Sequence, residues 1–170
     1  MSVGFHIRVG GVADLAGVVA LERGIAEAPH WAEAEYSAIL NIAKMVNVDS
    51  AVDGAVRRCL LVAEAEGRLL GFAVGKVIGS GTDGVGELES VAVDGSARRM
   101  GVGRALCRAV FAWCEGQNAE VVELEVRAGS GGAIALYTGL GFVVTGRRAK
   151  YYREPVEDAV LMRLDLAKYK

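Results

Sequence analysis

The amino-acid sequence predicts a single α/β domain built from about seven strands and about four helices. Short apolar or alternating segments, typical of strands, recur from residue 5 to residue 166. Between some of them, apolar residues spaced three or four positions apart indicate helices. No internal repeat, low-complexity tract or composition shift divides residues 1–170, so we expect one domain.

Length and composition are those of an ordinary globular chain. A chain of 170 residues can bury about two thirds of the surface that its unfolded form exposes. Hydrophobic residues make up 52% and charged residues 24%, as in soluble globular proteins, and the formal net charge is −2. This charge gives no general attraction to nucleic acid, so a polyanion-binding role is disfavoured.

The spacing of cysteine and histidine predicts neither disulfides nor a metal site. Cys59, Cys107 and Cys114 are odd in number and lack paired metal-ligand spacing, and His6 and His30 lie far from them in the sequence. The first residues lack the pattern of a signal peptide, and no window approaches the ~20 apolar residues of a membrane span. We therefore expect a reduced, cytoplasmic, metal-free protein that does not bind membranes.

The first 58 residues are predicted to form one strand and two helices. Residues 5–9 are expected to be the strand, and Asp14 is a plausible N-cap for the first helix. The second helix follows Ala28-Pro29 and ends before a loop or frayed turn over residues 49–58. The apolar residues of the two helices are Leu15, Val18, Val19, Leu21 and Ile25, and Tyr36, Ile39, Leu40 and Ala43.

His30 and Trp31 lie where the second helix begins, and two interpretations of them are open. They can line a substrate groove, or they can pack against the helix as part of its cap. The packing role is the more common one for residues of this kind.

The middle of the chain predicts three consecutive hairpin strands. Residues 59–64 and 69–78 flank Glu66-Gly67, a favourable pair for a hairpin turn. The polar, glycine-rich residues 79–84 are expected to form a surface turn. The third strand is expected over residues 86–93 and leads directly into an arginine-rich loop.

Charged residues line one face of two predicted strands. Glu87 and Glu89 share a face because side chains alternate along a strand, so this face is wet, ion-paired or functional. In the strand over residues 118–127, three charged residues alternate with three apolar ones, which indicates a cleft on the charged side. The charged set is Glu123, Glu125 and Arg127, and the apolar set is Val122, Leu124 and Val126.

A glycine-bearing arginine loop precedes a helix expected over residues 104–115. Gly101 and Gly103 would let an anion approach the free backbone N–H groups at the start of the helix. Arg104 and Arg108 oppose the helix dipole, which is reasonable if an anion with several charges binds there. The alternative is a tight turn followed by a solvated basic face. The inward residues are Leu106, Ala109, Val110 and Trp113, and Gly116 is the expected stop.

The last third of the chain predicts a helix between strands. Ser130 can cap this helix, and Gly141 closes it. Two further strands are expected over residues 142–148 and 159–166, around a loop at residues 151–155. The helix carries Ala133, Ile134, Leu136, Tyr137 and Leu140.

Two segments together resemble the GNAT superfamily of N-acetyltransferases. The pattern Arg98-x-x-Gly101-x-Gly103 after a strand is similar to the acetyl-CoA pyrophosphate loop of that superfamily, whereas dinucleotide and P-loop patterns fit poorly. Residues 122–142, VELEVRAGSGGAIALYTGLGF, are similar to its following strand and helix. With Tyr151-Tyr152 before Glu157-Asp158-Ala159, the chain resembles the ribosomal-protein-alanine N-acetyltransferases, the RimI type, most strongly over residues 85–166.

The resemblance implies a mixed, mostly antiparallel sheet that splays between its fourth and fifth strands, with acetyl-CoA as co-substrate and no metal. The pantetheine arm would bind in the gap as an added strand does. Residues 49–58 are extra length against the compact family pattern, and Ser130 replaces a common cofactor-contacting asparagine but can still donate a hydrogen bond. The implied cofactor-binding residues are Val91, Ala92, Val93, Arg98, Arg99, Met100, Gly101, Val102, Gly103, Arg104 and Ser130.

The resemblance also implies a chemistry and an acceptor. Glu125 would take the proton from an amine, through a water, and Tyr137 would protonate the departing thiolate. Glu87 or Glu89 is the rival base, and the cysteines are expected to be core residues. The acceptor would be a protein N-terminal α-amine, such as that of a ribosomal protein. Two alternatives are an acetyltransferase of a small amine or antibiotic and a catalytically silent acyl-CoA sensor.

Overall fold

The structure is a computed structural model that describes residues 4–26, 28–42, 56–79 and 83–169. Short 3-10 turns at Val12–Asp14 and Gly95–Ala97 precede the first and third helices. In chain order the elements of the described residues are β1 (His6–Val9), α1 (Leu15–Arg23), α2 (Glu33–Ile42), β2 (Arg57–Ala65), β3 (Arg68–Ile78), β4 (Gly84–Val93), α3 (Val102–Gly116), β5 (Ala119–Arg127), α4 (Gly131–Gly139), β6 (Val143–Arg153) and β7 (Val156–Asp165).

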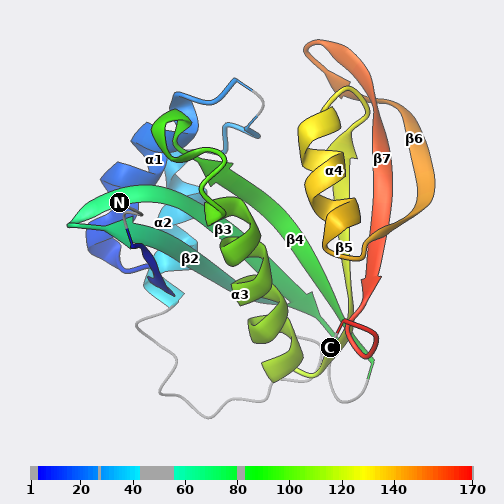
Figure 1. Ribbon diagram of the computed structural model, residues 1–170, viewed down its shortest axis with the longest axis horizontal. Coiled ribbons are helices and arrows are strands. Elements are labelled where there is room, and N and C mark those ends of the chain that lie inside the picture. Colours follow the sequence, from blue (N-terminus) through cyan, green and yellow to red (C-terminus); the bar gives the residue numbers. More distant parts are fainter. Residues whose placement is uncertain (1–3, 27, 43–55, 80–82, 170) are drawn as a thin grey trace.

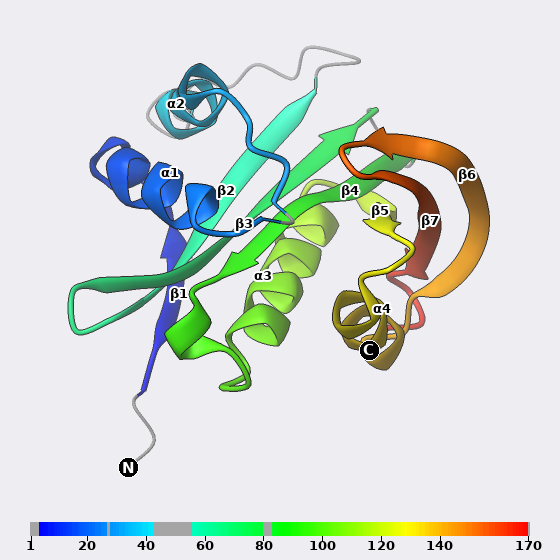
Figure 2. The same ribbon diagram turned by 90° about the horizontal axis from the view of Figure 1, so that it is seen from above.

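The strands of the described residues form one seven-stranded sheet in the order β1-β2-β3-β4-β5-β7-β6. The β4–β5 pair is parallel, because α3 crosses over between these two strands, and the other pairs of described strands are antiparallel. Helices α3 and α4 cover one face of the sheet, and α1 and α2 cover the other (Figure 1, Figure 2). This confirms the predicted α/β fold with a mixed, mostly antiparallel sheet and helices on both faces.

The predicted hairpin turn between β2 and β3 is present. Glu66 and Gly67 both have positive φ, 51° and 76°, which is the backbone of a type I′ turn. Glycine adopts this conformation without steric cost, so Gly67 suits the second position. The turn sets the register that runs from Ala65–Arg68 to Arg57–Val77.

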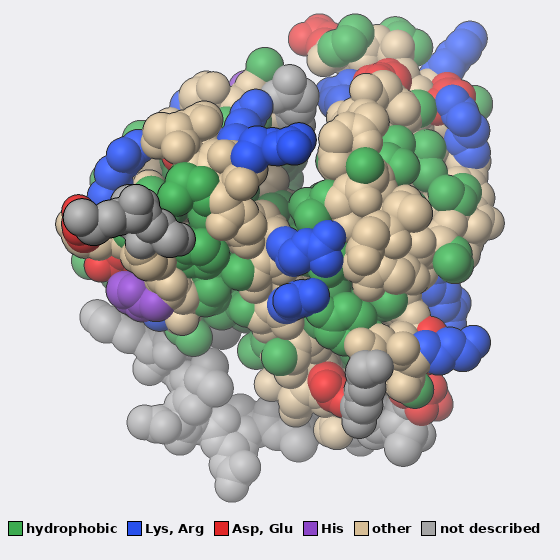
Figure 3. All heavy atoms as spheres, viewed as in Figure 1, with side chains coloured by type: hydrophobic (Ala, Val, Ile, Leu, Met, Phe, Trp, Pro, Cys, Tyr) green, Lys and Arg blue, Asp and Glu red, His purple; other side chains and the backbone are tan. Residues whose placement is uncertain are grey.

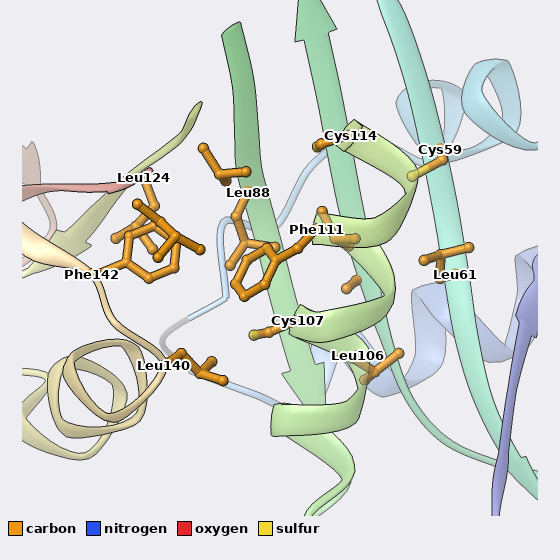
Figure 4. Packing of buried hydrophobic residues seen from close by; sticks show 14 of the residues in the cluster. Cys59, Leu61, Leu88, Leu106, Cys107, Phe111, Cys114, Leu124, Leu140 and Phe142 are labelled. Atoms are coloured by element: carbon orange, nitrogen blue, oxygen red, sulfur yellow. The ribbon is translucent and has the colours of Figure 1, made fainter. Parts of the chain in front are cut away.

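The larger core lies between α3 and the sheet (Figure 4). Helix α3 buries Leu106, Val110 and Phe111 almost completely against strand residues such as Leu88. Burying one such side chain contributes roughly 1.5–3 kcal/mol. The three cysteines also lie in this core, and burial raises the pKa of each thiol to about 12, which agrees with the expected core role.

A second core fills the opposite face of the sheet, under α1 and α2. Tyr36 of α2 is fully buried and meets Phe72 of β3 edge-to-face, with ring centroids 5.7 Å apart. Val18, Ile39 and Leu40 complete this cluster, as their helical spacing predicts. Among the described residues, no helix is both long and apolar enough to span a bilayer.

Several element boundaries differ from the predictions. Strand β2 begins at Arg57, inside the stretch predicted as a loop, because Arg57 and Arg58 pair with β3. Strand β6 runs on to Arg153, so the predicted loop at residues 151–155 contracts to a turn at Glu154-Pro155. Helix α2 begins at Glu33, after Ala28-Pro29 as predicted, where acidic residues favour a helix start. Three predicted features lie partly outside the described residues: the second helix at residue 43, the loop at residues 49–55 and the surface turn at residues 80–82.

Candidate active site

The sheet splays between β4 and β5. The two strands pair over one short stretch only, in which Gly84–Glu87 of β4 lie beside Ala119–Glu123 of β5. Beyond this point β4 stays paired with β3 up to Val93, and β5 stays paired with β7 up to Arg127, so the two halves of the sheet separate (Figure 1). This confirms the predicted splay between the fourth and fifth strands and leaves the β5-facing edge of β4 free for another extended chain.

Helix α3 begins at the open end of this gap. Gly101, its N-cap, has φ 82°, a left-handed conformation that favours glycine. The amide of Ala105 donates to the Gly101 carbonyl at 3.0 Å, so the helical ladder begins there. The preceding amides, from Val102 to Arg104, have no acceptor within the helix and form a site for an anion. The helix begins two residues before the predicted start, so Gly103 lies inside its first turn.

Gly103 faces the gap between α3 and α4. A β-carbon at Gly103 would lie 3.6 Å from Val93 of β4 and 3.6 Å from Leu136 of α4. The start of α3, the end of β4 and α4 therefore meet around this glycine. A group that enters between the two halves of the sheet passes the free amides of α3 at this point.

Basic side chains gather beside the hollow between α3 and α4 (Figure 3). Arg98 and Arg99 lie in the exposed loop before α3, and Arg104 and Arg108 are exposed on the helix itself. Arg104 Nη2 lies 3.3 Å from the point that a β-carbon at Gly139 of α4 would occupy, so this side chain extends across the hollow. These charges attract an anion despite the overall net charge of −2.

A cavity of about 470 Å³ occupies the gap between the strands. Four predicted site residues line it: Glu125 of β5, Tyr137 of α4, Ser130 before α4, and Val91 of β4. Ser130 is at the N-cap position of α4, but its side chain makes no capping hydrogen bond. The other lining residues are Ile25, Ala26, Ala28, Pro29, His30, Leu88, Glu89, Ser90, Val126, Arg127, Ala133, Tyr152 and Glu154.

Glu125 is the carboxylate of β5 that faces the cavity. Its side chain is 26% exposed, and Arg148 Nη2 lies 3.4 Å from its Oε1. A hydrogen bond to this carboxylate raises the pKa of Tyr151. Arg148 and Tyr151 both come from β6, so sequence neighbours of Glu125 do not supply its partners. The spacing of charged residues in β5 correctly predicts a polar cleft on this side.

Tyr137 of α4 faces the same cavity. Burial raises its pKa, so the phenol stays protonated well above neutral pH. Its ring packs edge-to-face on Phe142 at a centroid distance of 5.8 Å. Tyr152 lies nearby, with Arg127 over its ring at 4.1 Å, and burial also raises the pKa of Tyr152. Sequence reasoning did not select Tyr152 or Arg127 as site residues.

The rival carboxylates on β4 are ion-paired. Val74 pairs with Ser90 and Gly75 with Leu88, so Glu89 is the extra residue of a β-bulge. Its carboxylate is 7% exposed and accepts two hydrogen bonds from Arg58, at 2.8 and 2.9 Å.

Lys76 Nζ completes this ion-pair network. It lies 3.3 Å from Glu89 and 2.8 Å from Glu87. Glu89 lines the cavity, whereas Glu87 does not. Arg58 and Lys76 therefore already occupy the Glu89 carboxylate, whereas Glu125 has its contacts with Arg148 and Tyr151 of β6.

Between α1 and α2, the described residues 24–26 and 28–32 form the α1–α2 segment, and five of them line the cavity on one side. His30 lines the cavity, which supports the groove interpretation for this residue. Trp31 does not, and instead packs between Tyr36, at 5.5 Å, and Arg58, at 5.6 Å. His30 therefore fits the groove interpretation, and Trp31 fits the packing interpretation.

The described residues contain no group of three or more His, Cys, Asp or Glu side chains that could hold a metal ion. The polar side chains that line the cavity are three carboxylates, two phenols, two serine hydroxyls, a histidine and a guanidinium. These groups can exchange protons and bind an extended backbone.

Comparison with known proteins places this geometry in context. The model of a family described as "Acetyltransferase (GNAT) family" matches residues 24–142, which include the α1–α2 segment, β4, α3, β5 and α4. The N-alpha-acetyltransferase RimI of Mycobacterium tuberculosis is 36% identical over 103 residues, which cover 61% of this chain and 63% of that protein. The ribosomal protein bS18-alanine N-acetyltransferase of Escherichia coli K12 is 35% identical over 103 residues, covering 59% and 67%.

A solved structure extends the likeness to nearly the whole fold. The crystal structure of the ribosomal-protein-S18-alanine N-acetyltransferase from Escherichia coli matches with a TM-score of 0.73 at 25% identity, over 96% of this chain and 94% of that chain. The sequence alignment, in contrast, spans less than two thirds of the Mycobacterium tuberculosis protein.

Proposed function

Because the chain belongs to the acetyltransferase (GNAT) family, we propose that it transfers an acetyl group from acetyl-CoA to the α-amine at a protein N-terminus. The relatives named for protein N-terminal or ribosomal-protein acetylation support this choice of acceptor. Among them, the name of the Escherichia coli relative suggests the N-terminus of a ribosomal protein.

The splay between β4 and β5 is the observation that carries this proposal. It joins the free amides at the start of α3 to the cavity that holds Glu125 and Tyr137. Gly103, in the first turn of α3, lies beside Val93 of β4 and Leu136 of α4 at the α3 end of this path. These features fit an elongated co-substrate with an anionic group at one end and a reactive group at the other.

We assign the coenzyme A moiety to residues that follow this path. The amides from Met100 to Arg104 would hold the diphosphate, supported by the charges of Arg98 and Arg99. The backbone of Val91, Ala92 and Val93 would pair with the pantetheine arm as a strand does, and Ser130 would donate a further hydrogen bond. When bound, acetyl-CoA supplies a thioester carbonyl that an amine can attack.

Glu125 has a modest task as a base. An α-amine with a pKa near 8 is roughly 10% neutral at pH 7, so the base removes one proton during or before attack rather than generating a rare species. Glu125 lies in the cavity, 26% exposed, where a water can connect its carboxylate to the amine. Arg148 and Tyr151 orient the carboxylate from β6.

We propose Tyr137 as the acid that protonates the departing thiolate, and Tyr137→Phe should lower kcat about tenfold. The loss is moderate because a thiolate with a pKa near 8.5 is already a tolerable leaving group. Burial raises the pKa of Tyr137 above its ordinary value near 10, so the phenol is protonated at every pH below about 10. Steady-state rates from pH 6 to 10 should therefore show no alkaline loss from this residue. An unchanged kcat in the phenylalanine variant would remove Tyr137 from the mechanism.

The acceptor can be identified by mass spectrometry of peptides incubated with the protein and acetyl-CoA. We expect a 42-dalton gain on the N-terminal amine of at least one peptide, and no gain on internal lysines, whose amines are more than a hundredfold less often neutral at pH 7. Polyamine or aminoglycoside turnover with inert peptides would contradict the proposed acceptor. Coenzyme A binding without any turnover would instead indicate an acyl-CoA sensor.

A further inference from the structure

A buried carboxylate lies beneath the α1–α2 segment, outside the residues assigned so far. The side chain of Glu22, in α1, is 0% exposed. Its Oε2 accepts a hydrogen bond from Tyr36 Oη at 3.0 Å, whereas Oε1 has no hydrogen-bond partner among the described residues. A buried carboxylate is costly unless both oxygens are paired, and an apolar residue would fill the same space at lower cost.

Three side chains face this carboxylate, one from each part of the local structure. Tyr36 comes from α2, and burial together with the hydrogen bond to Glu22 raises its pKa, so it remains a donor. Arg23 of α1 has Nη1 3.6 Å from Oε2. His30 of the connecting segment has Nε2 3.7 Å from Oε1, just beyond hydrogen-bond distance.

His30 is oriented by a second contact. Its Nε2 lies 2.8 Å from the carbonyl oxygen of Ile25, and because a carbonyl only accepts, Nε2 carries the hydrogen. The same Nε2 lies 3.7 Å from Oε1 of Glu22, so the His30 ring stands between the Ile25 carbonyl and this carboxylate. His30 also has φ 51°, a left-handed conformation that is uncommon for residues other than glycine.

These contacts lead to one wall of the cavity. Ile25, Ala28 and His30 line the cavity but belong to neither helix. The carbonyl of Ile25 also accepts from the Ala28 amide at 3.2 Å, and Arg23 Nη1 donates to the Trp31 carbonyl at 3.3 Å. The wall is therefore attached to α1 and α2 through the groups that surround Glu22.

We propose that Glu22 is a positioning residue, which through Tyr36 and His30 holds the α1–α2 segment in the shape that receives the acceptor. The inference rests on the proposed function, since that function gives the cavity an acceptor. Helices α1 and α2 cover the face of the sheet opposite α3 (Figure 2), so this wall approaches the cavity from the side away from the anion site. A change in the wall should alter acceptor binding and leave coenzyme binding intact.

Glu22→Gln tests this role with almost no change in volume. The amide oxygen can still accept from Tyr36, but the side chain loses the negative charge that pairs with Arg23 and places an N–H₂ group, in place of an oxygen, toward His30 Nε2. We expect the KM for the acceptor to rise at least fivefold, with kcat and the KM for acetyl-CoA within twofold of the wild-type values. The matched control is Glu33→Gln, an exposed glutamate in the first turn of α2, which should leave all three values within twofold.

Hydrogen exchange of the ligand-free protein provides a readout that needs no turnover. In Glu22→Gln the amides of Ile25 and Ala28 should exchange at least fivefold faster, and those of α3 at the wild-type rate. If Glu22→Gln fails to fold, Tyr36→Phe removes the hydroxyl and keeps the buried ring, and the same two shifts are expected.

The outcomes separate this inference from the proposed function. An unchanged acceptor KM, or a raised KM with unchanged exchange in the segment, overturns the positioning role of Glu22. A wild-type protein that acetylates no acceptor overturns the proposed function instead. In that case the exchange measurement decides alone: faster exchange at Ile25 and Ala28 supports the holding role, and wild-type exchange there overturns it.

Discussion

Replacing Glu125 by glutamine should lower kcat for acetyl transfer by about 10²- to 10⁴-fold, the usual contribution of a general base. The carboxylate lies in the cavity on β5, and glutamine keeps its size while losing the ability to take a proton. The affinity for coenzyme A should stay within twofold, because the proposed diphosphate site lies at the start of α3 and not on β5. Steady-state kinetics with an acceptor peptide and calorimetry with coenzyme A measure the two effects.

The chain offers a matched control and a rival for this prediction. Glu123 lies two residues earlier on the same strand, is 49% exposed and contacts Arg163 at 3.5 Å, so Glu123→Gln should leave kcat within twofold. Glu89→Gln should cost less than Glu125→Gln, since Arg58 and Lys76 already occupy that carboxylate. If Glu89→Gln instead costs more, and Glu125→Gln keeps the wild-type pH–rate profile, then Glu89 is the base.

Local sequence patterns predict the parts of the site that one continuous segment builds. The strand, loop and helix from Val91 to Arg104 are contiguous, so glycine spacing and helix-start rules predict the helix and offer an anion site there as one of two interpretations, the other being a tight turn. The alternating charges of β5 likewise indicate a cleft without knowledge of what lies opposite. The prediction of the splay, and of acetyl-CoA as the molecule bound in it, depended on the resemblance to a family. No local rule states where two parallel strands separate.

The partners of the predicted residues come from distant segments and leave no local signal. Arg148 and Tyr151 reach Glu125 because the register of β6 and β7 shifts between Arg148 and Tyr152, which curves β6. The bulge at Glu89 similarly brings this carboxylate to Arg58 of β2. Register shifts of this kind depend on tertiary packing, so periodicity alone predicts the strands but not these contacts.

The α1–α2 segment shows the same limit from the side of the acceptor. Its residues lie between two helices without periodicity of their own, and Glu22 reads as an ordinary polar position of α1. Only the packing of α1 on α2 reveals that this carboxylate is fully buried beside Tyr36. A buried residue that positions a site without lining it is thus the hardest kind to predict from sequence.

Gly103→Asp should weaken coenzyme A binding about 100-fold or more without loss of stability. Gly103 lies in the first turn of α3, and a β-carbon there would be in ordinary contact with Val93 and Leu136, at 3.6 Å from each. An acidic residue in a first turn is stabilising by about 0.3–1 kcal/mol, and removing a glycine from a helix also helps. The Tm should therefore stay unchanged or rise.

The same carboxylate would occupy the space that the diphosphate needs. Two like charges about 4 Å apart near a protein surface repel by roughly 4 kcal/mol, and about 2.7 kcal/mol already corresponds to a 100-fold loss of affinity. Calorimetry with coenzyme A and thermal unfolding measure the two opposite effects on one variant. Such a combination distinguishes a blocked anion site from a damaged fold.

Gly116→Asp is the control at the other end of the same helix. A β-carbon at Gly116 would meet no described atom within 4 Å, and a negative charge at the C-terminal end of a helix is slightly destabilising. This variant should bind coenzyme A within twofold of the wild-type affinity and have a slightly lower Tm, the reverse of the expectation at position 103. If Gly103→Asp binds coenzyme A as tightly as the wild-type protein, the free amides of α3 do not hold the diphosphate, and the glycines before and within this helix serve only its packing against β4 and α4.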